Sequence, residues 1–371
     1  MRKSSARGFR SALRLHRAWL QASAPQGVER MRIHRQLVPG LALLFATTST
    51  AVAGERHDHR AKVLRVPQRY ATIQAAVDAA SDGDRVVVSR GRFCGATITR
   101  RLVLEGKHGA TIVGCEAPVS GAFRIGFFLP DGGASGTSIR GFRFDGRGVS
   151  NANLAPLGAG ILGRSADDVT VLGNHFDGTF QAITNTDGSG WSVLFNRVEH
   201  LTALTCDGAC AGGDAIVFQQ RLVLDRRPRG NAAAFNHVQG DIPDGLNEFS
   251  MVGVLVLGQV RARVVANLFD IPHNPEEEAQ GVGVLVTDHC CAAVEVSTSV
   301  KTDVFFNDGR RSELVLRVDP DVNGGPGNLE GAHIFGNRGE VELPPGATPL
   351  RRLVRFPEAA STRPARQALL H

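Results

Sequence analysis

The sequence is poor in aromatic residues, which limits how its interior can be filled. Phe, Trp and Tyr together make up 6% of the 371 residues, with one tyrosine and two tryptophans. Hydrophobic residues still reach 42%, so a core of small aliphatic side chains is available. The 43 glycines indicate many tight turns. This balance predicts many short strands around a narrow interior.

The sequence also lacks any basic stretch interleaved with aromatic residues, which is the usual mark of a nucleic-acid-binding surface. The formal net charge is +6 and the isoelectric point is near 9.3, values that alone would fit a polyanionic partner. Part of this charge falls within the first 35 residues, where arginine is dense. We therefore expect no nucleic-acid partner.

The N-terminal region has the pattern of a secretory signal peptide. Met31 opens a short basic segment, residues 37–46 form an apolar run too short for a stable membrane anchor, and Ala51-Val52-Ala53 is a cleavage pattern. The prediction is a signal peptide over 31–53, cleaved after Ala53, and an exported protein, secreted or periplasmic. Residues 1–30 are then a dispensable extension; alternatively, they form a long basic signal region. No later segment is apolar enough to span a membrane.

Six cysteines fit an oxidising compartment. Cys94 and Cys115 are 21 residues apart, close to one turn of a solenoid, and are predicted to pair across neighbouring coils. The other four are also disulfide candidates: Cys206, Cys210, Cys290 and Cys291. A metal site made from them with His289 is the alternative, but the spacing matches no zinc pattern, so no metal is predicted.

A short amphipathic helix is predicted at the start of the folded region. Ile73, Ala76, Val77 and Ala80 share one helical face, and residues 81–84 (Ser-Asp-Gly-Asp) end the helix. A buried strand follows at 86–88. Such a helix would cover the open end of a solenoid, which needs a cap against solvent.

The same local unit then recurs along the chain: a short apolar strand, an asparagine, and another apolar stretch. The asparagines are Asn174, Asn196, Asn236, Asn267, Asn307 and Asn337. Their spacings of 22, 40, 31, 40 and 30 residues suit single coils, the longer ones carrying loops. We predict that these asparagines stack as a hydrogen-bonded ladder at one turn per coil, and that they take a left-handed backbone conformation there.

A second series of strands, small residues followed by aliphatic ones, lies between these units. It comprises residues 158–163, 181–185, 214–218, 252–257 and 282–287. These strands are almost continuously apolar, which favours a parallel stack over a β-sandwich, whose strands should alternate polar and apolar residues. The predicted fold is an all-β, right-handed parallel β-helix over residues 62–343, followed by a Pro/Arg-rich tail over 344–371.

Two features of the chain resemble a known superfamily. Residues 70–93, YATIQAAVDAASDGDRVVVSRGRF, followed by TITRRLVLEG and GATIVG, resemble the start of pectin-lyase-like right-handed parallel β-helix proteins. The strand–Asn–strand units look like the parallel β-helix repeats of that superfamily. The resemblance covers about 63–343. It implies the fold, and it implies a choice among polysaccharide lyases, glycoside hydrolases, other carbohydrate-active enzymes and binding or structural proteins.

The site patterns of the enzyme branches are incomplete. Asn185-Thr186-Asp187 followed by Asp214 resembles part of a polygalacturonase site, but Ala215 stands where the second acid is needed, and no Gly-His-Gly or Arg-Ile-Lys follows. A lyase would need a base and a cation, often Ca²⁺. Possible ligands and bases without a common spacing are Asp187, Asp214, Asp241, Asp244, His200 and His237.

One polar ridge is a candidate binding surface. If the second strand series stacks, the residues after each strand form a row: Arg164, Asn185, Asp187, Gln219, Gln220, Gln259, Asp288 and His289. We take Asp187, Gln219, Asp288 and His289 as candidate ligand-binding residues; the alternative is a row of solvated turn residues. The leading hypothesis is a protein that binds an acidic or neutral polysaccharide, with no assigned catalytic residue. The alternatives are a polysaccharide lyase, with Ca²⁺ as its possible cofactor, a glycoside hydrolase, and a structural or adhesive protein.

Overall fold

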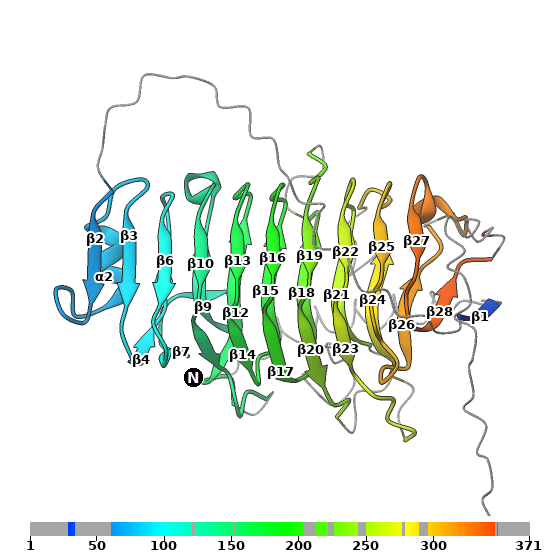
Figure 1. The fold of residues 1–371 in the computed structure, drawn as a ribbon, viewed down its shortest axis with the longest axis horizontal. Helices are drawn as coiled ribbons and strands as arrows, with labels where there is room; N and C mark the ends of the chain where they lie inside the picture. Colours follow the sequence, from blue (N-terminus) through cyan, green and yellow to red (C-terminus); the bar gives the residue numbers. More distant parts are fainter. Residues whose placement is uncertain are drawn as a thin grey trace, which may run out of the picture.

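The chain folds into a parallel β-solenoid built from three long sheets (Figure 1). The computed structural model describes residues 29–33, 61–120, 123–150, 153–203, 213–221, 226–243, 250–276, 279–288, 296–321, 323–345 and 347. Within these ranges, the coils run from sheet B through sheet C to sheet A and back to sheet B, and nearly every strand pairs in parallel with the corresponding strands of the neighbouring coils. The predicted fold class is confirmed.

The strands of the three sheets are as follows. Sheet A contains β5 (Ala96–Thr97), β9 (Phe123–Leu129), β12 (Leu157–Arg164), β15 (Gln181–Thr186), β18 (Asp214–Gln219), β21 (Met251–Leu257), β24 (Gly281–Thr287), β26 (Leu314–Val318), β28 (Gly339–Leu343) and β1 (Glu29–Ile33), with β8 (Val119–Ser120) paired antiparallel to β9. Sheet B contains β2 (Val63–Val66), β3 (Arg85–Val88), β6 (Val103–Gly106), β10 (Ser138–Arg140), β13 (Thr170–Leu172), β16 (Ser192–Leu194), β19 (Ala232–Ala234), β22 (Arg263–Val265), β25 (Asp303–Phe305) and β27 (His333–Phe335). Sheet C contains β4 (Gly91–Cys94), β7 (Ala110–Val113), β11 (Arg143–Asp145), β14 (His175–Asp177), β17 (Arg197–Leu201), β20 (His237–Gly240) and β23 (Leu268–Asp270).

The six predicted asparagines lie at the turn between sheets B and C and form one buried ladder. In each step, the side-chain oxygen of one asparagine accepts hydrogen bonds from the backbone and side-chain nitrogens of the asparagine in the preceding coil, as between Asn236 and Asn196 at 2.9 and 3.0 Å. The same pairing links every step from Asn174 to Asn337. Consecutive asparagines therefore belong to consecutive coils, and the longer spacings contain inserted loops.

The predicted backbone conformation of these asparagines is wrong by one residue. The left-handed residue is the one before each asparagine, with φ between 52° and 67°: Gly173, Phe195, Phe235, Ala266, Phe306 and Gly336. The asparagine side chain is instead turned into the solenoid, where it bonds the turn of the next coil. The buried amide group is hydrogen-bonded to the coils on both sides, as buried polar groups generally are.

The core is filled by aliphatic side chains and by phenylalanines from sheet C. Phe144 and Phe176 stack across adjacent coils with ring centroids 4.5 Å apart. The small residues of the second strand series make room for these rings: a Cβ atom added to Gly160 would lie 2.4 Å from the Phe176 ring. The alternation of small and aliphatic residues in β12 thus reflects packing against sheet C.

The N-terminal end of the solenoid is covered by helix α2 (Ile73–Asp78), which packs against β2, β3 and β5 (Figure 1). Ile73, Ala76, Val77 and Ala80 are all buried, as predicted from their common face. Thr72 caps the helix through its side-chain oxygen, which accepts a hydrogen bond from the backbone nitrogen of Ala75. Two short 3-10 helices, Gly132–Ala134 and Gly327–Leu329, lie in turns.

Several predictions concern residues outside the described ranges. These are residues 1–28 and 34–60 of the predicted extension and signal peptide, Cys206, Cys210, Asp244, His289, Cys290 and Cys291, and most of the tail after 344. The backbone of β1, which includes Met31, pairs antiparallel with β28. Cys94, the last residue of β4, and Cys115, two residues beyond the end of β7, form the predicted disulfide between adjacent coils. In the described part of the chain, no helix is long and apolar enough to cross a membrane.

Candidate functional site on the outer face of sheet C

The predicted polar ridge at the ends of the sheet A strands is not an exposed surface. Asp187, Gln219 and Asp288 are buried, with relative exposures of 0%, 8% and 1%. One carboxylate oxygen of Asp187 accepts a hydrogen bond from the backbone nitrogen of Arg221 at 2.7 Å, and the Gln219 amide donates to Thr186 Oγ1 at 2.9 Å. These groups are hydrogen-bonded within buried turns of the solenoid, and ligand binding by Asp187, Gln219, Asp288 and His289 stays a prediction.

The fold also separates the residues of the partial polygalacturonase pattern. The Asn185 amide holds a tight turn, donating to the carbonyl of Gly188 at 2.8 Å and accepting from its nitrogen at 3.0 Å. Asp214 begins β18 in register with Gln181. Asp187 follows the last residue of β15, six residues beyond Gln181, so the two carboxylates lie at opposite edges of sheet A, about 20 Å apart. They cannot act on one glycosidic bond.

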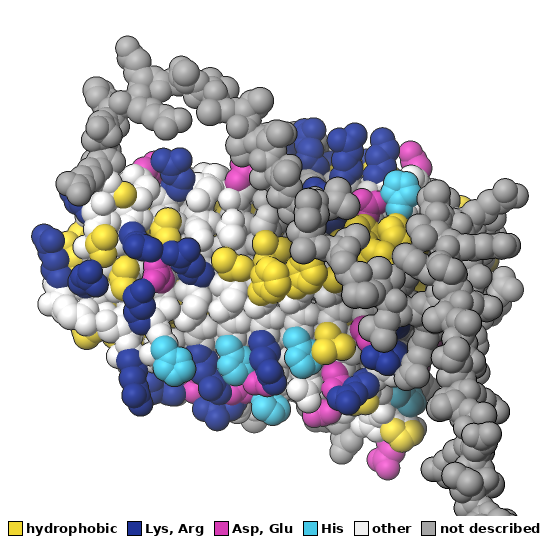
Figure 2. Space-filling view, viewed as in Figure 1, with side chains coloured by type: hydrophobic (Ala, Val, Ile, Leu, Met, Phe, Trp, Pro, Cys, Tyr) yellow, Lys and Arg dark blue, Asp and Glu magenta, His cyan; other side chains and the backbone are white. Residues whose placement is uncertain are grey.

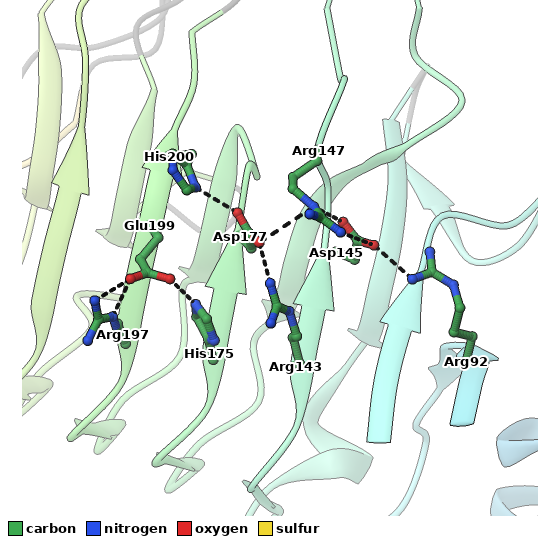
Figure 3. Close-up of polar contacts among 9 residues, drawn as sticks. All are labelled: Arg92, Arg143, Asp145, Arg147, His175, Asp177, Arg197, Glu199 and His200. Atoms are coloured by element: carbon green, nitrogen blue, oxygen red, sulfur yellow. Dashed lines mark hydrogen bonds and ion pairs between the residues drawn. The ribbon is translucent and has the colours of Figure 1, made fainter. Parts of the chain in front are cut away.

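The described surface richest in paired charges is the outer face of sheet C. Along each three-residue strand of this sheet, successive side chains point to opposite faces. In β14 the ring of Phe176 therefore enters the core, while His175 and Asp177 point outward. Parallel register aligns the outward residues in two rows (Figure 3). The first row contains Arg143, His175, Arg197 and His237, and the second contains Asp145, Asp177 and Glu199.

Asp177 lies at the centre of this charged face. Its carboxylate contacts Arg143 at 2.5 Å, Arg147 at 3.5 Å and Nδ1 of His200 at 2.8 Å (Figure 3). These three partners come from the preceding coil, the turn after it, and the following coil. One buried carboxylate thus fixes basic side chains from successive coils.

The neighbouring carboxylates have the same arrangement. Asp145 accepts hydrogen bonds from Arg147 at 2.9 Å and from Arg92 at 3.0 Å. Glu199 contacts Nε2 of His175 at 2.5 Å and the guanidinium of Arg197 at 2.6 Å. The pattern continues toward the C-terminal end, where Asp270 pairs with Arg311, and Asp308 pairs with Arg310 and Arg338.

The charges of the two signs are layered by depth. The side chain of Asp177 is 4% exposed and that of Asp145 9%, whereas Arg147 is 59% and His200 71% exposed. The carboxylates therefore form a floor, and the guanidinium and imidazole groups form the layer that meets solvent. Figure 2 shows Lys, Arg and His side chains gathered along the lower side of the molecule, the side on which Figure 1 places the sheet C strands.

The cationic layer keeps the buried carboxylates ionised. Hydrogen bonds from Arg147, reinforced by Arg92, lower the pKa of Asp145 to about 2 despite its burial. Burial raises the pKa of Asp177, but the hydrogen bonds from His200 and Arg143 outweigh it, and the net pKa lies below the usual value. Burial, together with Arg197, lowers the pKa of His237. Carboxylates with a lowered pKa are poor proton donors near neutral pH, so Asp145 and Asp177 are not suited to act as the acid of glycoside hydrolysis.

In the described ranges, no three His, Cys, Asp or Glu side chains come together as a metal site. Residues 319–330, DPDVNGGPGNLE, nevertheless have the spacing of an EF-hand calcium loop, a signal that the sequence analysis missed. Gly324 takes a positive φ of 80°, as the sixth position of that loop requires. Asp319, however, pairs with Arg317, and the Asp321 carboxylate accepts hydrogen bonds from three backbone nitrogens of the same turn.

The charged face was not predicted, although the sequence contains a signal for it. A basic–apolar–acidic triplet begins sheet C in successive coils, after Phe142 in the first and after Asn174 and Asn196 in the next two: Arg143-Phe144-Asp145, His175-Phe176-Asp177 and Arg197-Val198-Glu199. The middle residue is buried in each case, and the outer two form the two rows. His237 continues the first row, whereas His200 reaches Asp177 from an irregularity within β17 that no repeat predicts.

No family model, no curated protein and no solved structure matches this chain.

Proposed function

We propose that this chain is an exported protein that binds an acidic polysaccharide along the outer face of sheet C and does not use that face for catalysis. The observation that carries the proposal is the layering of exposed guanidinium and imidazole groups over a buried carboxylate floor. An extended uronate polymer presents carboxylates and hydroxyls at regular intervals. Guanidinium groups bind carboxylates in a bidentate manner and keep donors available beside their existing ion pairs.

The repeat of the solenoid supports a linear ligand. Neighbouring coils are about 4.8 Å apart, a spacing close to the rise of one sugar ring in an extended polysaccharide. Basic side chains recur at that interval along β11, β14, β17 and β20, with the guanidinium groups of Arg143 and Arg197 on alternate coils and the imidazoles of His175 and His237 on the coils between and beyond them. A rigid row of this kind binds a polymer with little loss of protein conformational entropy, because every carboxylate in the floor already fixes its partners.

Membership in the pectin-lyase-like superfamily and export are parts of this proposal. The parallel sheets and the asparagine ladder support the first. The Cys94–Cys115 disulfide supports an oxidising compartment, as does the predicted signal peptide over residues 31–53.

The test is binding of the purified protein to polygalacturonate and alginate, with dextran as the neutral comparison, by isothermal titration calorimetry. We expect binding to the acidic polymers only, weakening with added salt. Arg143→Gln and Arg197→Gln should each lower affinity about fivefold, as loss of a charge-assisted contact predicts. Arg85→Gln is the matched control, because Arg85 is as exposed as Arg143, 43%, and also pairs with a carboxylate, but lies on sheet B.

Equal affinity for dextran would refute the proposal. So would an unchanged affinity in both sheet C variants.

A second candidate function, proton transfer at sheet A, rests on Asp214. Burial raises the pKa of this carboxyl to about 7, which is the range of a general acid. The measurement is release of reducing ends, or of unsaturated products absorbing in the ultraviolet, from the same polymers. Activity that Asp214→Asn abolishes would establish this function, and absence of products from all polymers would exclude it for these substrates.

A further inference from the structure

The outer edge of sheet B carries phenylalanines in a backbone conformation that disfavours them. Phe195, Phe235 and Phe306 occupy the left-handed position of the asparagine turn, with φ of 54°, 57° and 57°. Other coils place Gly173 and Gly336 there, which adopt that conformation without strain. Phe195 is 59% exposed and Phe235 38% exposed, so burial in the core does not offset the strain. Strained residues that contribute little to the core mark functional positions.

These rings join two further phenylalanines in one apolar strip. The aromatic strip comprises Phe195 and Phe235 and, beyond the coil that carries Ala266, Phe305, Phe306 and Phe335. The rings of Phe195 and Phe235 stack with centroids 5.0 Å apart, and those of Phe305 and Phe335 with centroids 4.9 Å apart. Phe306 meets Phe305 and Phe335 edge to face, and the rings together present apolar surface that suits an acyl boundary. Figure 2 shows this hydrophobic band across the centre of the face.

A second row runs parallel to the aromatic strip, at the turns that lead into sheet B. The basic edge comprises Arg229, Arg261 and Lys301 in these turns and Arg263, the first residue of β22, all exposed and on three consecutive coils. None of the four makes an ion pair or a side-chain hydrogen bond within the described residues, unlike the arginines of sheet C. Arg261 and Ala266 are five residues apart on one coil, so the edge lies about 16 Å from the aromatic row. Figure 2 shows Lys and Arg side chains along the upper border of the face.

We propose that this face of sheet B docks on an anionic lipid bilayer, with the aromatic strip at the acyl boundary and the basic edge at the phosphate headgroups. Interfacial binding requires an apolar row and unpaired cations on one surface, and both are present here. A second copy of the chain is a poor occupant, because its own basic edge would bring like charges together. A soluble polyanion would leave the aromatic strip in water.

The proposal goes beyond polysaccharide binding and uses different residues on a different sheet. Its test is co-sedimentation of the full chain with vesicles of phosphatidylcholine, with or without phosphatidylglycerol. We expect binding that requires phosphatidylglycerol and decreases with salt. The apolar segment 37–46 is common to every variant, so differences between variants report on sheet B alone.

Two double variants separate the two rows. Phe195→Gly with Phe235→Gly should keep the fold, because glycine occupies the same turn in other coils, and should lose most vesicle binding. Arg261→Gln with Lys301→Gln should lower partitioning about fivefold for each charge removed. Arg143→Gln with Arg197→Gln is the control; it removes the same charge from sheet C and should leave vesicle binding unchanged while weakening polygalacturonate binding.

Three results would overturn the proposal. One is equal binding to vesicles without phosphatidylglycerol, and another is an equal loss of binding in the sheet C control. The third is self-association of the parent chain that the phenylalanine variant abolishes, which would assign the aromatic strip to a second copy. None of these results bears on polysaccharide binding, which is measured separately.

Discussion

Replacing an asparagine in the middle of the ladder should cost more stability than replacing the one at its end. The Asn236 side chain makes four buried hydrogen bonds: it accepts from the backbone and side-chain nitrogens of Asn196, and it donates to the Val193 carbonyl and to Asn267 Oδ1. At about 1 kcal/mol for each bond, Asn236→Ala should lower the free energy of unfolding by about 4 kcal/mol. That loss is a large part of the stability of a typical domain.

The C-terminal member of the ladder provides the comparison. Asn337 accepts two hydrogen bonds from Asn307 and donates one to the Val304 carbonyl, so Asn337→Ala should cost about 3 kcal/mol. Gln239→Ala, on an exposed position of β20, is the control and should lie within about 0.5 kcal/mol of the parent. Urea unfolding followed by circular dichroism measures all three. A cost below about 1 kcal/mol for Asn236→Ala, or a larger cost at Asn337, would refute the assignment of stability to these hydrogen bonds.

Two further predictions follow from the charges and from the disulfide. The pKa of Asp145 and that of Glu105 are each lowered to about 2, so their ion pairs stabilise the fold above the unfolded pKa near 4, and this contribution should be lost as pH falls from about 4 to about 2. Thermal unfolding across that range should show the fall, and Asp145→Asn should reduce its slope; an unchanged slope would contradict the pairing. The Cys94–Cys115 disulfide closes a loop of 21 residues, so reduction, or Cys94→Ser with Cys115→Ser, should cost about 3 kcal/mol in urea unfolding. Identical midpoints with and without reductant would show that the bridge contributes nothing.

The sequence was sufficient to predict the fold because a solenoid repeats its constraints in every coil. Asn196, Asn236 and Asn267 each stand between two short apolar strands. Because this pattern recurs in every coil, each repeat supports the assignment made for the others. The helix at Ile73–Asp78 was predictable because its apolar residues recur at helical spacing and therefore share one face. The left-handed position was not, because Phe195 and Phe235 occupy it instead of the glycine or asparagine that usually signals it.

The candidate site was harder to predict because the sequence does not show whether a polar side chain points into the solenoid or out toward solvent. Asp187 and Asp177 both follow apolar stretches, yet Asp187 turns inward to bond a backbone nitrogen and Asp177 joins an outward network. The direction of the side chain depends on whether the residue lies in a turn or in a strand. When strands have only three residues, their ends are easily predicted one position too early or too late. A one-residue error moves a side chain to the other face.

The two proposed binding surfaces can be occupied at the same time. Sheets B and C meet at the asparagine ladder, so the aromatic strip and the charged face lie on either side of one rigid turn. A solenoid resting on a bilayer through sheet B would leave sheet C facing the solvent at the side, with its cationic row parallel to the membrane. A bound acidic polymer would then run along the lipid surface. Because the same turn carries both surfaces, Asn236→Ala should weaken both kinds of binding, whereas Phe195→Gly and Arg197→Gln should each affect only one.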